Sequence, residues 1–311
     1  MTVVLGPAVR CVESTVTLGE GSRWHASSGE LLWVDIMAGR LHREYVDAAG
    51  NLTRVATHDV PMTVGSVAPV ASIGGWVLAA GRGFAYLPDG GELRVLAETD
   101  SGAGTRMNDG VCDRLGRFWA GTMALDLTPG AGSLYRLDRD GSVSAVLRGM
   151  TISNGIGWSL DVATMYLTDS GPGCIFAFDY DEPAGALSSR RVLVQLGAGE
   201  GVPDGLTVDD EGCLWVAVFG GSEVRRYSPS GELLERVPVP ARQVTSCCFG
   251  GPAGTTLFVT TARERFGERE SLEQPLAGSV FAVPTAMTAP AVAEFQPAPE
   301  LQRVLTSGAS S

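Results

Sequence analysis

The sequence contains no lysine, and all 23 of its strongly basic side chains are arginine. A Schiff-base lysine and a phosphate-loop lysine are therefore excluded. Acidic residues number 35, giving a formal net charge of −12. Because nucleic acids and anionic membranes bind concentrated positive charge, neither is expected as a partner. We predict a small-molecule ligand.

Long apolar runs are also missing. No stretch reaches the ~20 apolar residues of a membrane span, and the N-terminus has neither the basic start nor the apolar core of a signal peptide. These absences predict a cytoplasmic protein. The six cysteines are scattered without CxxC pairs, which favours buried thiols in a reducing compartment over disulfides or a zinc site.

Histidine is scarce. His25, His42 and His58 all fall in the first quarter of the chain, and there is no GxSxG motif. A Ser/His/Asp triad is therefore not expected. The glycine-rich stretches lead into strand-like segments rather than helices, so dinucleotide loops are not expected either.

The chain does contain a repeat. A strand-like apolar run with a central aromatic residue occurs six times, at successive spacings of 43, 43, 47, 49 and 43 residues. The central residues are Trp33, Trp76, Trp119, Tyr166, Trp215 and Phe258. This period is typical of one four-stranded antiparallel blade per repeat. We predict an all-β, six-bladed β-propeller whose ring is closed by an N-terminal strand from roughly residues 3–17.

The repeats span nearly the whole chain. Although the length alone would permit two domains, the repeats predict a single propeller domain over residues 1–295. Residues 296–311 are polar and are predicted to form a flexible C-terminal tail. The expected assembly is a monomer or a small homo-oligomer.

A second set of positions precedes the aromatic ones. Four repeats carry an oxygen-bearing side chain 13, 11, 12 and 11 positions before their aromatic residue: Glu20, Asn108, Asn154 and Asp204. The other two repeats offer about Gly65 and Ser246, neither a strong ligand. The innermost strands of a propeller line its axis, so the four side chains should converge. Two carboxylates in a narrow channel repel each other unless a cation lies between them.

These positions predict one divalent metal bound by Glu20, Asn108, Asn154 and Asp204. All-oxygen donors suit Ca²⁺, Mg²⁺ or Mn²⁺, and Ca²⁺ is favoured. Four protein ligands leave coordination positions for water and substrate. Asp204 is the candidate base that positions the water. Arg106 lies two residues before Asn108, on the same strand face, and could hold an anionic or hydroxylated substrate.

Each residue alone also has an ordinary structural explanation. A polar residue followed by glycine is common at turns, and Arg106 could be a solvated charge at the rim. Asp109 should face away from its neighbour Asn108, which indicates a supporting role. Asp126 could contact a sugar hydroxyl or could be a solvated loop acid. The shared register of four such residues favours the metal site.

The motifs LGEGSRW, RMNDGVCDRLGRFWAGTM, ISNGIGW and VPDGLTVDDEGCLWVA resemble those of the sugar-lactonase family that includes gluconolactonase, regucalcin and the luciferin-regenerating enzyme. The resemblance runs from about residue 18 to residue 283 and implies a metal-dependent six-bladed propeller. It implies that Glu20, Asn154 and Asp204 bind the metal, with Asp204 also the general base. It further implies that Arg106 and Asn108 bind substrate and complete the pocket.

The resemblance implies hydrolysis of an aldonolactone such as gluconolactone to its free acid. It also widens the possible ions to Ca²⁺, Zn²⁺, Mn²⁺, Mg²⁺ or Fe²⁺. Some members bind sugar hydroxyls through a glutamate after GTM, and simple counting places Asp126 there. Two alternatives stay open: a phosphotriesterase-like or broad esterase using the same pocket, and a divalent-metal-binding propeller without catalysis.

Overall fold

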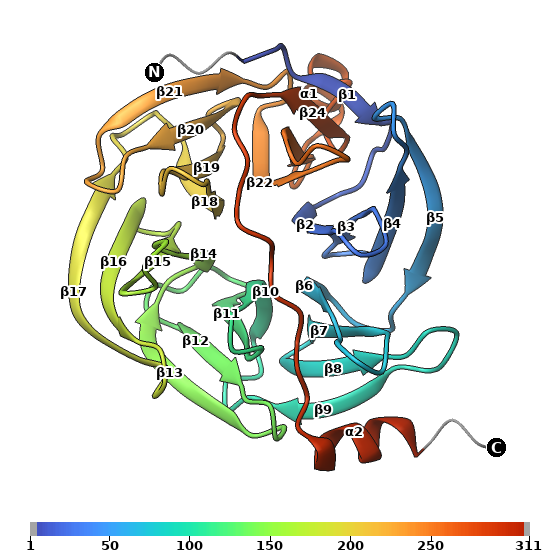
Figure 1. Cartoon of the computed structure of the whole chain (residues 1–311). Coiled ribbons are helices and arrows are strands. Elements are labelled where there is room, and N and C mark those ends of the chain that lie inside the picture. The colour runs from blue at the N-terminus through green and yellow to red at the C-terminus, as the bar shows by residue number, and fades with distance from the viewer. Residues whose placement is uncertain (1–4, 308–311) are drawn as a thin grey trace.

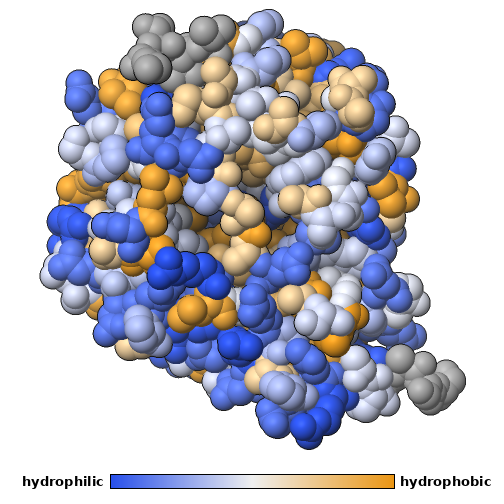
Figure 2. Space-filling view, in the orientation of Figure 1, coloured by the Kyte–Doolittle hydropathy of each residue, from blue (hydrophilic) through white to orange (hydrophobic). Residues whose placement is uncertain are grey.

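The computed structural model describes residues 5–307 and is an all-β, propeller-like ring of mostly antiparallel sheets (Figure 1). The inner strands surround a central axis and the outer strands form the rim. Within the described residues, no helix is long and apolar enough to cross a membrane. The face seen in Figure 2 is mixed, with hydrophobic side chains scattered among hydrophilic ones.

Four sheets have four strands each, paired in chain order. The first contains β2 (Gly19–His25), β3 (Glu30–Asp35), β4 (Arg40–Val46) and β5 (Leu52–Asp59). The second contains β6 (Val64–Pro69), β7 (Trp76–Ala80), β8 (Gly83–Leu87) and β9 (Arg94–Glu98). The third contains β10 (Thr105–Cys112), β11 (Phe118–Ala124), β12 (Gly132–Leu137) and β13 (Val143–Met150). The fourth contains β14 (Ser153–Trp158), β15 (Thr164–Asp169), β16 (Cys174–Asp181) and β17 (Ala186–Gln195).

The other strands form one eight-stranded sheet. One part contains β18 (Val202–Val208), β19 (Leu214–Phe219), β20 (Glu223–Tyr227) and β21 (Leu233–Pro238). The other contains β22 (Gln243–Gly250), β23 (Thr256–Ala262), β24 (Val280–Pro284) and β1 (Val9–Val12). A single residue pair, Phe219 with Gln243, joins β19 to β22.

The N-terminal strand expected within residues 3–17 is present as β1, which pairs antiparallel with β24. Residues 3 and 4 of that expected segment lie outside the described residues. Because β24 is the last strand of the chain, this pairing brings the beginning and the end of the β structure side by side (Figure 1).

All six repeated aromatic residues lie on the second strand of their four-strand group, and each is at most 4% exposed. Every residue of β3, β7 and β11 is buried, whereas the outer strands β5 and β17 are largely exposed. The second strands are apolar on both faces because they pack between neighbouring sheets. Truncating a buried side chain of this size to alanine typically costs about 3–5 kcal/mol.

The turn before the second strand carries a buried acid in two of the groups. Asp113 accepts a hydrogen bond of 2.8 Å from Nε1 of Trp119, and Asp209 accepts one of 2.8 Å from Nε1 of Trp215. Asp209 also accepts hydrogen bonds from the backbone N–H of Cys213 and from Nε of Arg226. The acids of the DRLG and DDEG turns thus hydrogen-bond Trp119 and Trp215 to the loops that precede their strands.

The chain leaves β24 and crosses the face of the ring to α2 (Pro299–Thr306) (Figure 1). Phe295 is fully buried on this path and exchanges backbone hydrogen bonds with Pro69 and Ala71. The segment predicted as a flexible tail, 296–311, therefore contains a helix, in which Leu305 is buried. Its flexibility stays a prediction, and residues 308–311 lie outside the described residues.

Candidate functional site

The four polar positions found in the sequence lie on the innermost strands β2, β10, β14 and β18. Each strand pairs irregularly with its neighbour at that position. The irregularities fall between Glu20 and Arg23, Met107 and Gly110, Ser153 and Ile156, and Pro203 and Leu206. Such bulges re-aim side chains out of the regular alternation and are common beside active sites.

Close packing between the innermost strands requires glycine at several positions. A Cβ at Gly155 would lie 2.5 Å from the backbone nitrogen of Leu206, on the neighbouring inner strand. A Cβ at Gly65 would lie 2.3 Å from the carbonyl oxygen of Asn108. The innermost strands therefore approach too closely for larger side chains. This explains why the second repeat supplies no ligand at Gly65.

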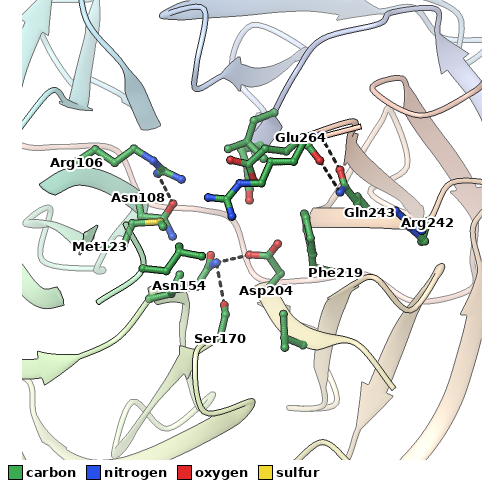
Figure 3. Close-up of a pocket in the computed structure, with 16 residues that line it drawn as sticks. Arg106, Asn108, Met123, Asn154, Ser170, Asp204, Phe219, Arg242, Gln243 and Glu264 are labelled. Atoms are coloured by element: carbon green, nitrogen blue, oxygen red, sulfur yellow. Dashed lines mark hydrogen bonds between the residues drawn. The ribbon is translucent and has the colours of Figure 1, made fainter. Parts of the chain in front are cut away.

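The structure brings five of the six predicted site residues to one cavity of about 310 Å³ (Figure 3). All five are buried: Glu20, Arg106, Asn108, Asn154 and Asp204. Asp126 does not line this cavity. Its exposed carboxylate instead accepts hydrogen bonds from the backbone nitrogen (3.0 Å) and Oγ1 (2.7 Å) of Thr128.

Asn154 and Asp204 contact each other in this cavity. Nδ2 of Asn154 donates to Oδ1 of Asp204 and, at 3.2 Å, to Oγ of Ser170 (Figure 3). The other amide atom, Oδ1 of Asn154, is buried and has no hydrogen-bond partner among the described residues. A buried acceptor without a donor is costly, so this oxygen is suited to a cation or a ligand donor.

The two carboxylates are held in an environment that disfavours their charge. Burial, together with the negative charge of Asp109, raises the pKa of Glu20 to about 8. Burial and the charges of Glu20 and Asp109 raise the pKa of Asp204 well above its usual range. Asp109 itself pairs with Arg23, whose Nη2 lies 3.1 Å from its Oδ1. A divalent cation between Glu20 and Asp204 would offset both effects.

Arg106 and Asn108 form a second contact pair. Nη1 of Arg106 donates to Oδ1 of Asn108 at 2.7 Å and to the carbonyl oxygen of Met107 at 3.0 Å. Nδ2 of Asn108 donates to the carbonyl oxygen of Ser153 at 3.0 Å. Burial lowers the pKa of Arg106, opposed by the charges of Glu264, Glu20 and Asp204. The Asn108 amide oxygen thus accepts a hydrogen bond from Arg106, whereas the Asn154 amide oxygen has no donor among the described residues.

Sequence reasoning missed a second wall of the cavity. It contains Ser170, Phe219, Arg242, Gln243, Glu264 and Arg265. The last two belong to the loop after β23, which precedes the short helix α1 (Glu268–Glu273). The signal available in the sequence was the charged stretch TARERFGERE, which breaks the apolar pattern directly after the sixth aromatic strand.

The donor set fits a hard cation only if amide oxygens take part. Within residues 5–307 there is no cluster of three His, Cys, Asp or Glu side chains that could hold a metal. Glu20, Asp204 and the unpartnered Oδ1 of Asn154 nevertheless supply oxygen donors of the kind Ca²⁺ and Mg²⁺ prefer. The residues present therefore fit such an ion.

A second cavity, of about 330 Å³, lies against residues 290–293 of the C-terminal segment. Its lining is mostly apolar and includes Trp158, Leu206 and Val208. Its one acid, Asp113, is already bonded to Trp119 and Arg117. This cavity therefore lacks the converging carboxylates that make the first one the candidate site.

Comparison with known proteins identifies a family for this chain. Residues 18–263 match the family described as "SMP-30/Gluconolactonase/LRE-like region". The chain is 38% identical to regucalcin of Danio rerio over 281 residues, which is 88% of this chain and 93% of that protein. It is 34% identical to the "Putative sugar lactone lactonase YvrE" of Bacillus subtilis over 277 residues, 88% of this chain and 93% of that one.

A solved structure has a similar fold. The calcium-binding protein regucalcin from Agrobacterium tumefaciens superposes with a TM-score of 0.86 at 28% identity, covering 93% of this chain and 98% of that one. A match of this quality over nearly the whole length supports the propeller-like fold.

Proposed function

This chain belongs to the SMP-30/gluconolactonase/LRE-like family, and we propose that it is a metal-dependent hydrolase that opens the ring of a sugar lactone. An aldonolactone such as gluconolactone, giving the free acid, is the proposed substrate type. The observation that carries the proposal is the convergence of Glu20, Asn154 and Asp204 in one buried cavity. The family and the name of the Bacillus subtilis relative supply the reaction class.

We also infer that the ring has six blades. The eight-stranded sheet consists of two four-stranded groups that share only the Phe219–Gln243 pair. Counting these groups separately gives six blades, in agreement with the six aromatic repeats. The proposed partner is a small molecule alone. The cytoplasmic location and the monomeric or small homo-oligomeric state remain predictions.

In this proposal Glu20, Asn154 and Asp204 hold one divalent cation, with Ca²⁺ favoured by the oxygen donors. Bound there, the ion would polarise the lactone carbonyl and lower the pKa of a water molecule. Asn108 is the fourth expected ligand, but its Oδ1 already accepts a hydrogen bond from Arg106. That bond supports a role for Asn108 in orienting substrate, and the second lone pair of this oxygen remains available for a cation.

Asp204 is the proposed general base. It accepts a proton from the attacking water, whose oxygen bonds to the carbonyl carbon, and the ring C–O bond then breaks. The proton returns to the ring oxygen, which becomes a hydroxyl group, so one water is consumed. Arg106 is placed to hold the substrate, because its guanidinium lines the cavity beside Asn108.

Proton release from a panel of γ- and δ-aldonolactones tests the proposal. The protein is first treated with chelator and then supplied with Ca²⁺, Mg²⁺, Mn²⁺, Zn²⁺ or Fe²⁺ separately. We expect turnover that disappears with chelator and returns with at least one ion. Undiminished hydrolysis in chelator would contradict the metal-dependent mechanism.

Two other functions share this cavity. A phosphotriesterase-like or broad esterase would turn over paraoxon-type esters faster than sugar lactones in the same assay. A divalent-metal-binding propeller without catalysis would bind the ion and hydrolyse none of the substrates. The second is favoured by the name of the solved relative, a calcium-binding protein. Isothermal titration calorimetry with Ca²⁺, run beside the activity panel, separates binding from turnover.

A further inference from the structure

Arginine is the main cation of this chain, and most arginines have a carboxylate oxygen within 4.0 Å. Buried examples are Arg23, Arg225 and Arg226. Among residues 5–307, Arg106 and Arg265 have no such partner although both line the candidate cavity. An acidic protein that pairs its other buried arginines thus leaves the buried Arg106 and the exposed Arg265 without a direct ion pair at its proposed site.

Arg106 is only 6% exposed. Among the described residues, its hydrogen bonds run from Nη1 to two uncharged acceptors, the Met107 carbonyl and the Asn108 amide oxygen. Taking a guanidinium out of water without a counter-ion is unfavourable. Because the guanidinium is planar and forked, its other nitrogens remain suited to an anionic oxygen of a bound molecule.

Arg265 reaches the same cavity from the loop after β23. Its backbone has φ of 58°, a left-handed conformation that non-glycine residues rarely adopt. The side chain of the buried Gln243 fixes the preceding residue: Nε2 donates to the Glu264 carbonyl at 2.9 Å, and Oε1 accepts from the Glu264 backbone nitrogen at 2.7 Å (Figure 3). The scaffold therefore holds Arg265 at the cavity wall.

Two other charges of this wall are accounted for. Arg242 lies 2.7 Å from Glu270 and over the ring of Phe266, so it is already neutralised. Glu264 is the one acid of the second wall. A divalent cation would balance Glu20 and Asp204, and Glu264 would balance one of the two remaining arginines. One positive charge is then left over, which a neutral aldonolactone would not use.

We infer that the substrate is a lactone bearing a second, anionic group, a carboxylate or a phosphate, and that Arg106 and Arg265 hold this group. The inference rests on the proposed lactonase function and deepens it. Arg265 would be the specificity-determining residue, since it lines the cavity, lies outside the predicted metal set and forms no ion pair among the described residues.

The test compares three lactones with the metal-loaded protein: a neutral aldonolactone, the matching lactone with a carboxylate at the carbon remote from the ester, and the matching lactone with a phosphate there. We expect kcat/KM to be at least about 10-fold higher for one of the two anionic substrates, the size of one charge-assisted hydrogen bond. The identity of that substrate distinguishes carboxylate from phosphate.

Variants then test whether Arg265 causes the preference for an anionic lactone. Arg265→Gln should raise KM for the preferred anionic lactone about 10-fold with kcat nearly unchanged, and should change KM for the neutral lactone much less. Arg265→Lys should restore part of the loss. Arg263→Gln is the matched control, because Arg263 belongs to the same loop, has no ion pair among the described residues and does not line the cavity.

The outcomes are distinguishable. Preference for the neutral lactone, or an equal effect of Arg265→Gln on all three substrates, would overturn this inference and leave the lactonase proposal standing. Hydrolysis of none of the three would overturn the proposed function and this inference with it.

Discussion

Asn154 donates a hydrogen bond to Asp204 and, on the other side of the same amide, presents a buried oxygen with no donor among residues 5–307. The pair therefore combines a carboxylate and a neutral oxygen at one end of the cavity, with Glu20 as the second carboxylate. Among the described residues, the Asn154 oxygen has no hydrogen-bond donor and neither carboxylate forms an ion pair. The arrangement becomes satisfied when a cation accepts electron density from the three oxygens.

Removing the Asn154 amide should weaken the proposed metal site. We expect Asn154→Ala to bind its preferred divalent ion at least about 10-fold more weakly in calorimetry. Ser170→Ala is the control, because it removes the other acceptor of Asn154 Nδ2 without removing an oxygen ligand. Equal affinity in Asn154→Ala and the unaltered protein would show that the amide oxygen is not a ligand.

Asp204 and Asp126 should respond differently to the same amide substitution. Asp204→Asn is expected to lower kcat for the best lactone by roughly 10²–10⁴-fold, the typical contribution of a general base. Metal content is measured in the same samples, so that loss of the ion is separated from loss of the base. Asp126→Asn should leave kcat and KM nearly unchanged, since Asp126 is exposed and outside the cavity lining. A large rise in KM for Asp126→Asn would instead show that Asp126 contacts the sugar, as counting along the sequence predicts.

The aromatic repeat was predictable because its physical cause is strong and local. Residues such as Trp119 and Trp215 are fully buried, so the second strands are largely apolar on both faces. The register of the site residues followed, since equivalent strands place equivalent positions at the axis. That is why Asn154 and Asp204, 50 residues apart, could be predicted to meet.

Other features depend on contacts that no local pattern encodes. The bulges beside Glu20 and Asp204 arise from how two strands pair, which alternation alone does not reveal. The wall containing Arg265 depends on the Gln243 side chain fixing a distant loop. Counting along a loop placed the expected sugar contact at Asp126, whereas in the structure the next residue, Leu127, with φ of 64°, lines the cavity and Asp126 does not.

The pKa of Glu20 gives a pH-dependent expectation for the metal-free protein. The folded pKa is raised from 4.5 to about 8, so the unfolded chain loses this proton at lower pH than the folded one. The contribution of Glu20 to stability therefore falls as pH rises from about 4.5 and levels off above about 8. Glu20→Gln should be more stable than the unaltered protein at pH 8, with the difference shrinking toward pH 5.

Urea unfolding of both chelated proteins at several pH values measures this difference. Saturating divalent cation should stabilise the unaltered protein strongly at pH 8 and Glu20→Gln much less, because the ion binds the ionised carboxylate. A difference between the two chelated proteins that is independent of pH would contradict the raised pKa.

The turn acid Asp209 should matter for stability rather than for activity. It is fully buried and accepts hydrogen bonds from Nε1 of Trp215 and Nε of Arg226, each at 2.8 Å. Asp209→Ala leaves both donors buried without this partner, and we expect it to lower the free energy of unfolding by about 3 kcal/mol or more. Glu232→Ala, at an exposed turn, is the control and should change stability by less than about 0.5 kcal/mol. Equal unfolding midpoints for the two variants would mean that the tryptophan is held by packing alone.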